Sequence, residues 1–280
     1  MIEYAFDHPR SYHIYDTMRI CLTPSADHAA DLVAHEMLTR LRAKPNLVIG
    51  LATGSTPIGV YQRLVDAYQA GTASFVKVHT FNLDEYLDLP AVHPQSYRFF
   101  MQRYLFDAID IPAAQIHFPP AEGKNLRRRC QAYETDIQKL GGIDIQLLGI
   151  GSNGHIGFNE PTSSLRSRTR IKTLTPKTLQ DNARFYAPDE TQPTLAVTMG
   201  IGTILDARTI LLQAFGAKKA EAIRAAVEGP LSSYCPGSAL QLHEDVTLFL
   251  DAEAASLLSM RDYYRQTQQH EAQLRLEDRL

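Results

Sequence analysis

The sequence has few of the features that mark secreted, disulfide-rich or membrane proteins. Its 280 residues include only three cysteines, Cys21, Cys130 and Cys235, which are odd in number and too widely spaced for a disulfide framework or a zinc site. No uninterrupted apolar stretch approaches the ~18 residues that a membrane span needs. The first residues lack the cationic start and apolar stretch of a signal peptide. These absences predict a cytoplasmic protein with reduced thiols and no membrane partner.

The chain also lacks a strong charge of one sign. Its 28 lysines and arginines face 31 aspartates and glutamates, which gives a formal net charge of −3. No global basic field is present, so nucleic acid is disfavoured as a partner. The 16 glycines and 15 prolines are too few for a collagen-like or low-complexity chain. Hydrophobic residues make up 44% of the sequence, which is typical of a globular protein with a sizeable core.

Apolar, β-branched runs alternate with amphipathic segments along the chain. Near-continuous apolar runs are typical of strands covered on both faces, and they lie at residues 47–51, 76–83, 143–150, 209–213 and 246–250. Apolar residues at helical spacing lie between and after them, at residues 26–41, 57–70, 126–140, 217–227 and 252–264. This alternation predicts one doubly wound, Rossmann-like α/β domain, with a mostly parallel sheet and helices on both faces.

Three predicted strand exits carry residues suited to chemistry, and ligands of open parallel sheets bind outside the carboxyl ends of the strands. At the first exit, Gly54, Ser55 and Thr56 form a turn before Pro57 opens a helix. Free backbone N–H groups and the helix dipole make such a turn an anion site. A plain helix cap is the alternative interpretation. No Gly-Lys-Ser/Thr sequence follows, which excludes a nucleotide-binding P-loop.

The second exit places two neighbouring carboxylates, Asp84 and Glu85, where a strand leaves the sheet. Adjacent side chains point to different sides there, so only one of the two is predicted to face a site. A carboxylate in a partly dry environment can serve as a general base. A loop-capping aspartate beside a solvated glutamate is the alternative.

The third exit is a glycine-rich loop. Gly149, Gly151 and Gly154 have the spacing of the dinucleotide-binding G-x-G-x-x-G motif. The residues that follow are poor helix formers, and no acidic residue lies about 20 positions on after a second strand, so we reject the nucleotide interpretation. The loop instead predicts a polar catalytic surface, formed by Asn153, His155 and Glu160.

Five segments together resemble the glucosamine-6-phosphate deaminase (isomerising) family: FNLDEY, GIGSNGHIGFNEP, SRTRIKTLT, NARFY and AVEGP. The resemblance implies an enzyme of amino-sugar catabolism, a hydrolase that converts glucosamine 6-phosphate into fructose 6-phosphate and ammonia without a metal or other cofactor. Its partner is then a small sugar phosphate, and a homo-oligomer is left open. The match divides the chain into an N-terminal extension (1–17), the deaminase domain (18–265) and a polar C-terminal tail (266–280).

The resemblance also implies roles for individual residues. The enolisation base falls on Asp84, the ring-opening histidine on His155 and its supporting carboxylate on Glu160. The neighbouring ring-opening position, which is aspartate in some members, is Asn153 here. An asparagine carries no charge, so it can only orient His155 or the substrate. The implied phosphate-binding residues are Gly54, Ser55, Thr56, Arg184 and Lys219.

Residues 162–188 resemble the mobile lid of the family. Within them, Ser164, Arg170 and Lys172 match positions that some members use to bind the activator N-acetylglucosamine 6-phosphate. The sequence leaves open whether this chain is activated in the same way.

Two other functions account for fewer of these residues. A 6-phosphogluconolactonase-type hydrolase needs a phosphate site and a histidine but has no use for a C2 base at Asp84. A regulator that senses sugar phosphates should add a helix-turn-helix, and the 17 residues before the matching region are too few for one. Such a sensor is also free to lose Asp84, His155 or Glu160, and all three are present.

Overall fold

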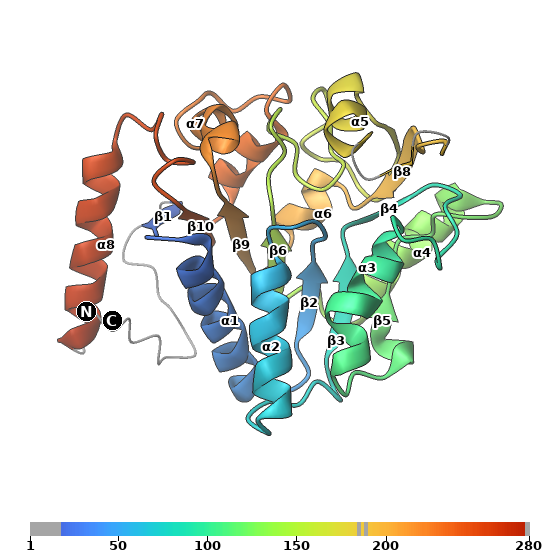
Figure 1. The fold of residues 1–280 in the computed structure, drawn as a ribbon, viewed down its shortest axis with the longest axis horizontal. Helices are drawn as coiled ribbons and strands as arrows, with labels where there is room; N and C mark the ends of the chain where they lie inside the picture. The colour runs from blue at the N-terminus through green and yellow to red at the C-terminus, as the bar shows by residue number, and fades with distance from the viewer. Residues whose placement is uncertain (1–17, 184–185, 188–189, 278–280) are drawn as a thin grey trace.

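The computed structural model describes residues 18–183, 186–187 and 190–277. Its centre is a sheet of seven parallel strands (Figure 1). In chain order these strands are β1 (Arg19–Leu22), β2 (Val48–Leu51), β3 (His79–Asn82), β5 (Ile116–His117), β6 (Ile145–Leu148), β9 (Thr209–Ala214) and β10 (Val246–Leu250). Their spatial order is β1-β10-β9-β6-β2-β3-β5. The five predicted strands are confirmed, and the two unpredicted ones, β1 and β5, form the edges.

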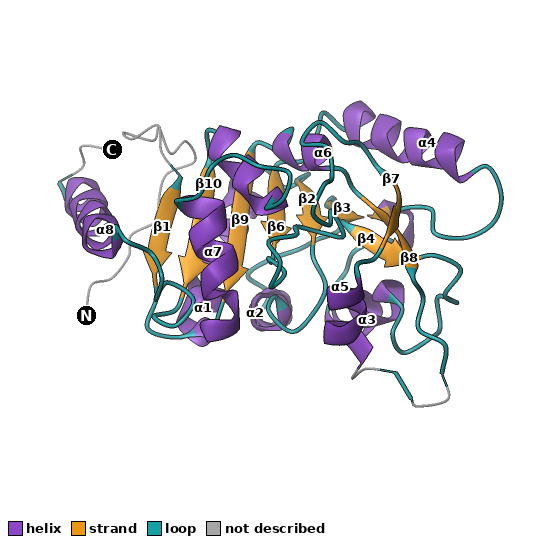
Figure 2. Cartoon of the chain, turned by 90° about the horizontal axis from the view of Figure 1, so that it is seen from above, coloured by secondary structure: helices purple, strands orange, loops and turns teal. Residues whose placement is uncertain are grey.

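Helices cover both faces of this sheet, with α1 and α2 below it and α4 and α6 above it in Figure 2. One face carries α1 (Ala26–Ala43), α2 (Ile58–Gln69) and α3 (Tyr97–Tyr104), and the other carries α4 (Leu126–Lys139), α6 (Ile201–Leu205) and α7 (Ala220–Val227). Successive strand residues point to opposite faces, so Val48 joins one hydrophobic cluster and Ile49 the other. The predicted doubly wound α/β fold is confirmed.

A second, smaller sheet follows the carboxyl end of β3. It consists of β4 (Asp84–Tyr86), β7 (Arg170–Thr173) and β8 (Leu195–Thr198), which are antiparallel in the order β4-β8-β7. Helix α5 (Pro176–Asn182) lies between β7 and β8 in the chain. The sequence did not predict this sheet, because β4 and β7 carry charged residues and have no unbroken apolar run.

The helix predicted at residues 252–264 is wrong in its position. Residues 252–260 consist largely of turns, and the carboxylate of Asp251 accepts a hydrogen bond from the backbone N–H of Ala254 at 2.7 Å. Helix α8 (Arg261–Leu276) begins later. It continues through most of the segment that the sequence predicted as a polar tail, whereas residues 1–17 and 278–280 lie outside the described part of the chain.

Helix α8 lies beside β1, at one edge of the main sheet (Figure 1). The side-chain amide oxygen of Gln268 accepts a hydrogen bond from the Leu22 N–H at 3.2 Å, and so satisfies a backbone group on the edge strand. Within the described ranges, no helix is long and apolar enough to cross a membrane. Further 3₁₀ helices lie at Phe106–Ala108, Ala113–Gln115, Ala217–Lys219 and Pro236–Leu242.

Candidate active site

The predicted site residues follow the carboxyl ends of four neighbouring strands. β9, β6, β2 and β3 lie side by side, and the chain leaves them toward Lys219, the glycine-rich loop, the Gly54 turn and Asp84 respectively. β2 and β6 are adjacent, but the chain continues from β2 to β3 on one side and from β6 toward β9 on the other. This arrangement is a topological switch point, where open α/β sheets bind ligands.

Asp84 is the first residue of β4 and is only 6% exposed. Burial, together with the charge of neighbouring Glu85, raises the pKa of Asp84 to about 8, against a smaller lowering by the backbone N–H of Phe158. A carboxyl group with this pKa gains and loses its proton near neutral pH. Such behaviour suits a general base.

Glu85, the adjacent carboxylate, caps a helix. Its oxygens accept hydrogen bonds from Ser96 Oγ at 2.9 Å, from the Tyr97 N–H at 3.0 Å and from the Arg98 N–H at 2.9 Å. These donors lie at the N-terminus of α3, where backbone N–H groups have no acceptor within the helix. The geometry therefore gives Glu85 a structural role and leaves Asp84 as the candidate base.

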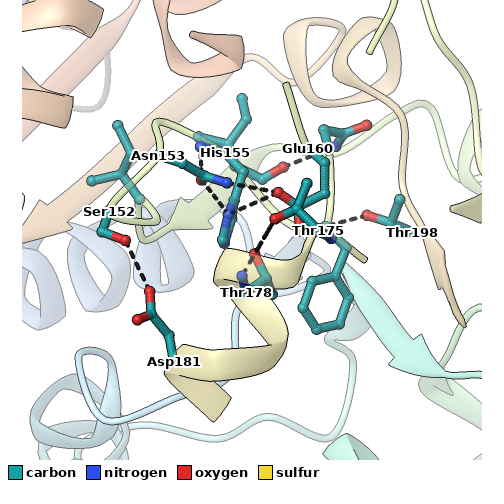
Figure 3. Close-up of polar contacts among 12 residues, drawn as sticks. Ser152, Asn153, His155, Glu160, Thr175, Thr178, Asp181 and Thr198 are labelled. Carbon is teal, nitrogen blue, oxygen red and sulfur yellow. Dashed lines mark hydrogen bonds and ion pairs between the residues drawn. The ribbon is translucent and has the colours of Figure 1, made fainter. Parts of the chain in front are cut away.

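Asn153, His155 and Glu160 form a hydrogen-bonded relay (Figure 3). The imidazole Nδ1 of His155 lies 2.7 Å from Asn153 Oδ1, and Asn153 Nδ2 donates to Glu160 Oε2 at 2.8 Å. Because an amide oxygen can only accept, Nδ1 carries a proton, and Nε2 of the neutral ring is an acceptor. The direct separation between His155 Nδ1 and Glu160 Oε2 is 3.6 Å. Glu160 therefore orients the imidazole mainly through the Asn153 amide, which stands between them.

Glu160 is ionised and held from a second side. It is 1% exposed, and burial alone raises the pKa of a carboxyl group. Interactions with the nearby side chains of His155 and Thr178, and a hydrogen bond from the Thr175 N–H at 3.1 Å, outweigh burial and lower the pKa of Glu160 to about 2. Thr178 lies on α5 and Thr175 caps its start. The loop that carries His155 is therefore tied to the segment that resembles a lid (Figure 3).

The predicted phosphate-binding residues that the structure describes follow β2 and β9, two strands of the main sheet. Gly54 has φ of +100°, a conformation that residues with a Cβ rarely adopt, and the two hydroxyl residues after it precede α2. Lys219 Nζ donates to the carbonyl of Ile150 at 2.6 Å, just beyond β6, whereas Lys218 is exposed. Arg184 lies outside the described residues.

The site also contains residues that the sequence analysis did not single out. Thr198 of β8 lies directly across the ladder from Asp84. Tyr86, two residues after Asp84, accepts a hydrogen bond from Asn182 Nδ2 at 3.0 Å, and its ring centre lies 5.3 Å from that of Phe158. The FNLDEY segment contains Tyr86 and offers a signal for it. No local pattern marks Thr198, because strand pairing alone brings it to Asp84.

Among the residues that the structure describes, no group of three or more His, Cys, Asp or Glu side chains could hold a metal ion. The fold and the site define an α/β protein that holds a hydrogen-bonded histidine and a buried carboxyl group at a topological switch point, where such sheets bind ligands. The family model described as glucosamine-6-phosphate isomerases/6-phosphogluconolactonase matches residues 23–249. The chain belongs to this family.

Curated relatives match over nearly the whole chain. A glucosamine-6-phosphate deaminase of Shewanella loihica is 58% identical over 248 residues, which are 89% of this chain and 92% of that protein. One of Marinomonas sp. is 54% identical over 260 residues, which are 92% of this chain and 98% of that protein.

Solved structures show the same fold. A monomeric glucosamine-6-phosphate deaminase superposes with a TM-score of 0.83 at 43% identity, over 86% of this chain and 100% of that one. A 6-phosphogluconolactonase from Trypanosoma brucei superposes with a TM-score of 0.68 at 22% identity, over 86% and 99% of the two chains. This second likeness concerns the fold alone.

Proposed function

We propose that the protein converts glucosamine 6-phosphate and water into fructose 6-phosphate and ammonia. The observation that carries this proposal is the presence of two different proton-transfer groups, the His155 relay and the Asp84 carboxyl, at neighbouring strand exits. Opening the sugar ring and enolising the open chain each need such a group. Relatives named for this activity match most of the chain. A cytoplasmic location and the assembly state stay predictions.

In this proposal the His155 relay opens the pyranose ring. Nε2 accepts the proton of the anomeric hydroxyl and returns it to the ring oxygen, so that the bond between C1 and the ring oxygen breaks and an aldehyde forms. The imidazolium that forms between these two steps is stabilised by ionised Glu160 through the Asn153 amide.

Asp84 then moves a proton between neighbouring carbons. Its carboxylate removes the C2 proton and returns a proton at C1, by way of an enolamine, which gives the imine of a ketose. A positively charged amino group at C2 favours the ionised form of Asp84 and so offsets its raised pKa. Water adds to C2, the C–N bond breaks and ammonia leaves. The net reaction is therefore hydrolytic.

The Gly54 turn and Lys219 bind the phosphate in this proposal, together with Ser55, Thr56 and Arg184. A dianion is favoured beside the N-terminus of α2 and a lysine ammonium. Phosphate binding far from the reacting carbons fixes C1 and C2 relative to the two proton-transfer groups. Such orientation supplies a large part of the rate enhancement of many enzymes.

A lactonase activity is the competing function, and it gives Asp84 no proton to remove from C2. The purified chain is to be incubated separately with glucosamine 6-phosphate and with 6-phosphogluconolactone. We expect ammonia and fructose 6-phosphate in equal amounts, and a loss of ~10²–10⁴-fold in Asp84→Asn. Asp88→Asn is the matched control, because Asp88 is exposed and its φ of +59° suits asparagine. Lactone hydrolysis without ammonia release is the result that overturns the proposal.

A further inference from the structure

We infer that Thr198 is a positioning residue for Asp84, and that it acts through the peptide that joins Gly157 and Phe158 in the glycine-rich loop. The inference rests on the proposed function, which assigns the transfer of the C2 proton to Asp84. Thr198 lies on β8. It belongs neither to the sequence motifs nor to the relay of Asn153, His155 and Glu160.

The small antiparallel sheet holds Thr198 directly beside Asp84. In the ladder, Asp84 of β4 pairs with Thr198 of β8, and Arg170 of β7 pairs with the same threonine from the other side. Side chains of paired residues share one face of a sheet. Thr198 is 0% exposed, so its hydroxyl has to be satisfied by partners within the protein.

The hydroxyl of Thr198 both accepts and donates. Its Oγ1 accepts a hydrogen bond from the Phe158 N–H at 3.0 Å (Figure 3) and donates to the carbonyl of Met199 at 3.2 Å. The same N–H acts on the carboxylate of Asp84, where it lowers the pKa against the effect of burial. Thr198 therefore fixes the direction of a backbone N–H that also stabilises the ionised base.

The glycine before Phe158 shows how closely these groups pack. Gly157 has φ of +54°, and a methyl group on its Cα would lie 3.1 Å from Thr198 Oγ1 and 3.3 Å from Asp84 Oδ2. The hydroxyl and the carboxylate thus both lie beside the same backbone segment. Asn159 separately ties the loop to the residue that follows β8, because its Nδ2 donates to the Met199 carbonyl at 2.8 Å. Removal of the Thr198 hydroxyl should therefore loosen the Phe158 N–H without releasing the whole loop.

The test compares Thr198→Val, which keeps the branched shape and loses the hydroxyl, with Thr198→Ser, which keeps the hydroxyl. For Thr198→Val we expect kcat for ammonia release to fall about 10- to 100-fold, with KM within about twofold of the wild type. The deuterium isotope effect with substrate labelled at C2 should rise, because proton removal becomes the slower step. Thr198→Ser should recover most of kcat.

Thr203→Val is the matched control. Thr203 is also buried, and its hydroxyl donates to Glu134 Oε1 at 2.7 Å on the α4 side of the sheet. This variant should lower the melting temperature and leave kcat and the isotope effect unchanged. A normal kcat in folded Thr198→Val, or a loss that Thr198→Ser does not recover, overturns the inference.

Two further comparisons keep the outcome interpretable. If circular dichroism shows that Thr198→Val is unfolded, Thr198→Ala takes its place against Thr198→Ser, with the same expected changes. If the wild type releases no ammonia, the proposed function fails. If the wild type is active and Asp84→Asn is inactive while Thr198→Val equals the wild type, the role of Thr198 alone is refuted.

Discussion

Replacement of Asp84 by asparagine should stabilise the folded protein, and the gain should grow as the pH rises. Asparagine has nearly the same shape but cannot ionise. In the folded wild type, burial and the charge of Glu85 raise the pKa of Asp84 from its ordinary 3.8 to about 8. The folded state then keeps a proton that the unfolded chain releases. The contribution of Asp84 to stability therefore falls as the pH rises from about 4 to about 8.

The size of the effect follows from the two pKa values. One pKa unit corresponds to about 1.4 kcal/mol. At pH 5, the pH is little more than one unit above the pKa of 3.8 that Asp84 has in the unfolded chain. Asp84 therefore destabilises the folded state by about 2 kcal/mol at this pH. At pH 9, which is above both pKa values, the destabilisation reflects the whole difference between them and amounts to about 6 kcal/mol. The free-energy gain in Asp84→Asn should therefore grow by about 4 kcal/mol between pH 5 and pH 9.

Urea unfolding followed by circular dichroism at pH 5, 7 and 9 measures this difference. Asp88→Asn serves as the control, because Asp88 is exposed and the same exchange there should shift stability by a small amount at every pH. If the unfolding free energies of Asp84→Asn and the wild type differ by the same amount at all three pH values, Asp84 is not held in a dry environment. The raised pKa that supports the role of Asp84 as a general base is then refuted.

Three other predictions concern the relay and the phosphate. His155→Gln should slow ammonia release from the cyclic substrate more than from an acyclic analogue, and equal losses in steady-state kinetics would place His155 outside ring opening. Asn153→Asp should raise the pKa of Glu160, because two carboxyl groups then meet where a 2.8 Å hydrogen bond lies now. The acidic limb of the pH–activity profile should therefore move to a higher pH, and an unchanged profile contradicts this. Lys219→Ala should raise KM about tenfold and weaken inhibition by inorganic phosphate through loss of a charge-assisted contact, whereas exposed Lys218→Ala should not.

The sequence predicted the central strands of the main sheet well and its edge strands poorly. A strand buried on both faces has an unbroken apolar run, such as the fully buried β10. β1 and β5 lie at the edges, are mostly half-buried and have no such run. The C-terminal helix was misplaced because Asp251 holds the turns before it and also accepts a hydrogen bond from the distant Gly216 N–H at 3.0 Å. The spacing of apolar residues along the chain does not reveal that long-range contact.

The candidate site was predictable where one strand exit carries the chemistry. Asp84 and the glycine-rich loop could be found in this way, because each directly follows an apolar run. The separate roles of Asp84 and Glu85 could not, since they depend on where α3 begins and offers its N–H groups. The place of Asn153 between His155 and Glu160, and that of Thr198 beside Asp84, depend on how the loop folds and how the strands pair.

The central claim is that Asp84 removes the C2 proton of an amino-sugar phosphate and delivers a proton, exchangeable with solvent, to C1 before ammonia leaves. The most direct measurement is proton NMR of the purified protein with glucosamine 6-phosphate in D₂O. The account predicts fructose 6-phosphate and ammonium in equal amounts, with deuterium from the solvent entering the product at C1 and both products forming ~10²–10⁴-fold more slowly with Asp84→Asn. Glucosamine 6-phosphate that stays unchanged while 6-phosphogluconolactone is hydrolysed under the same conditions would contradict it.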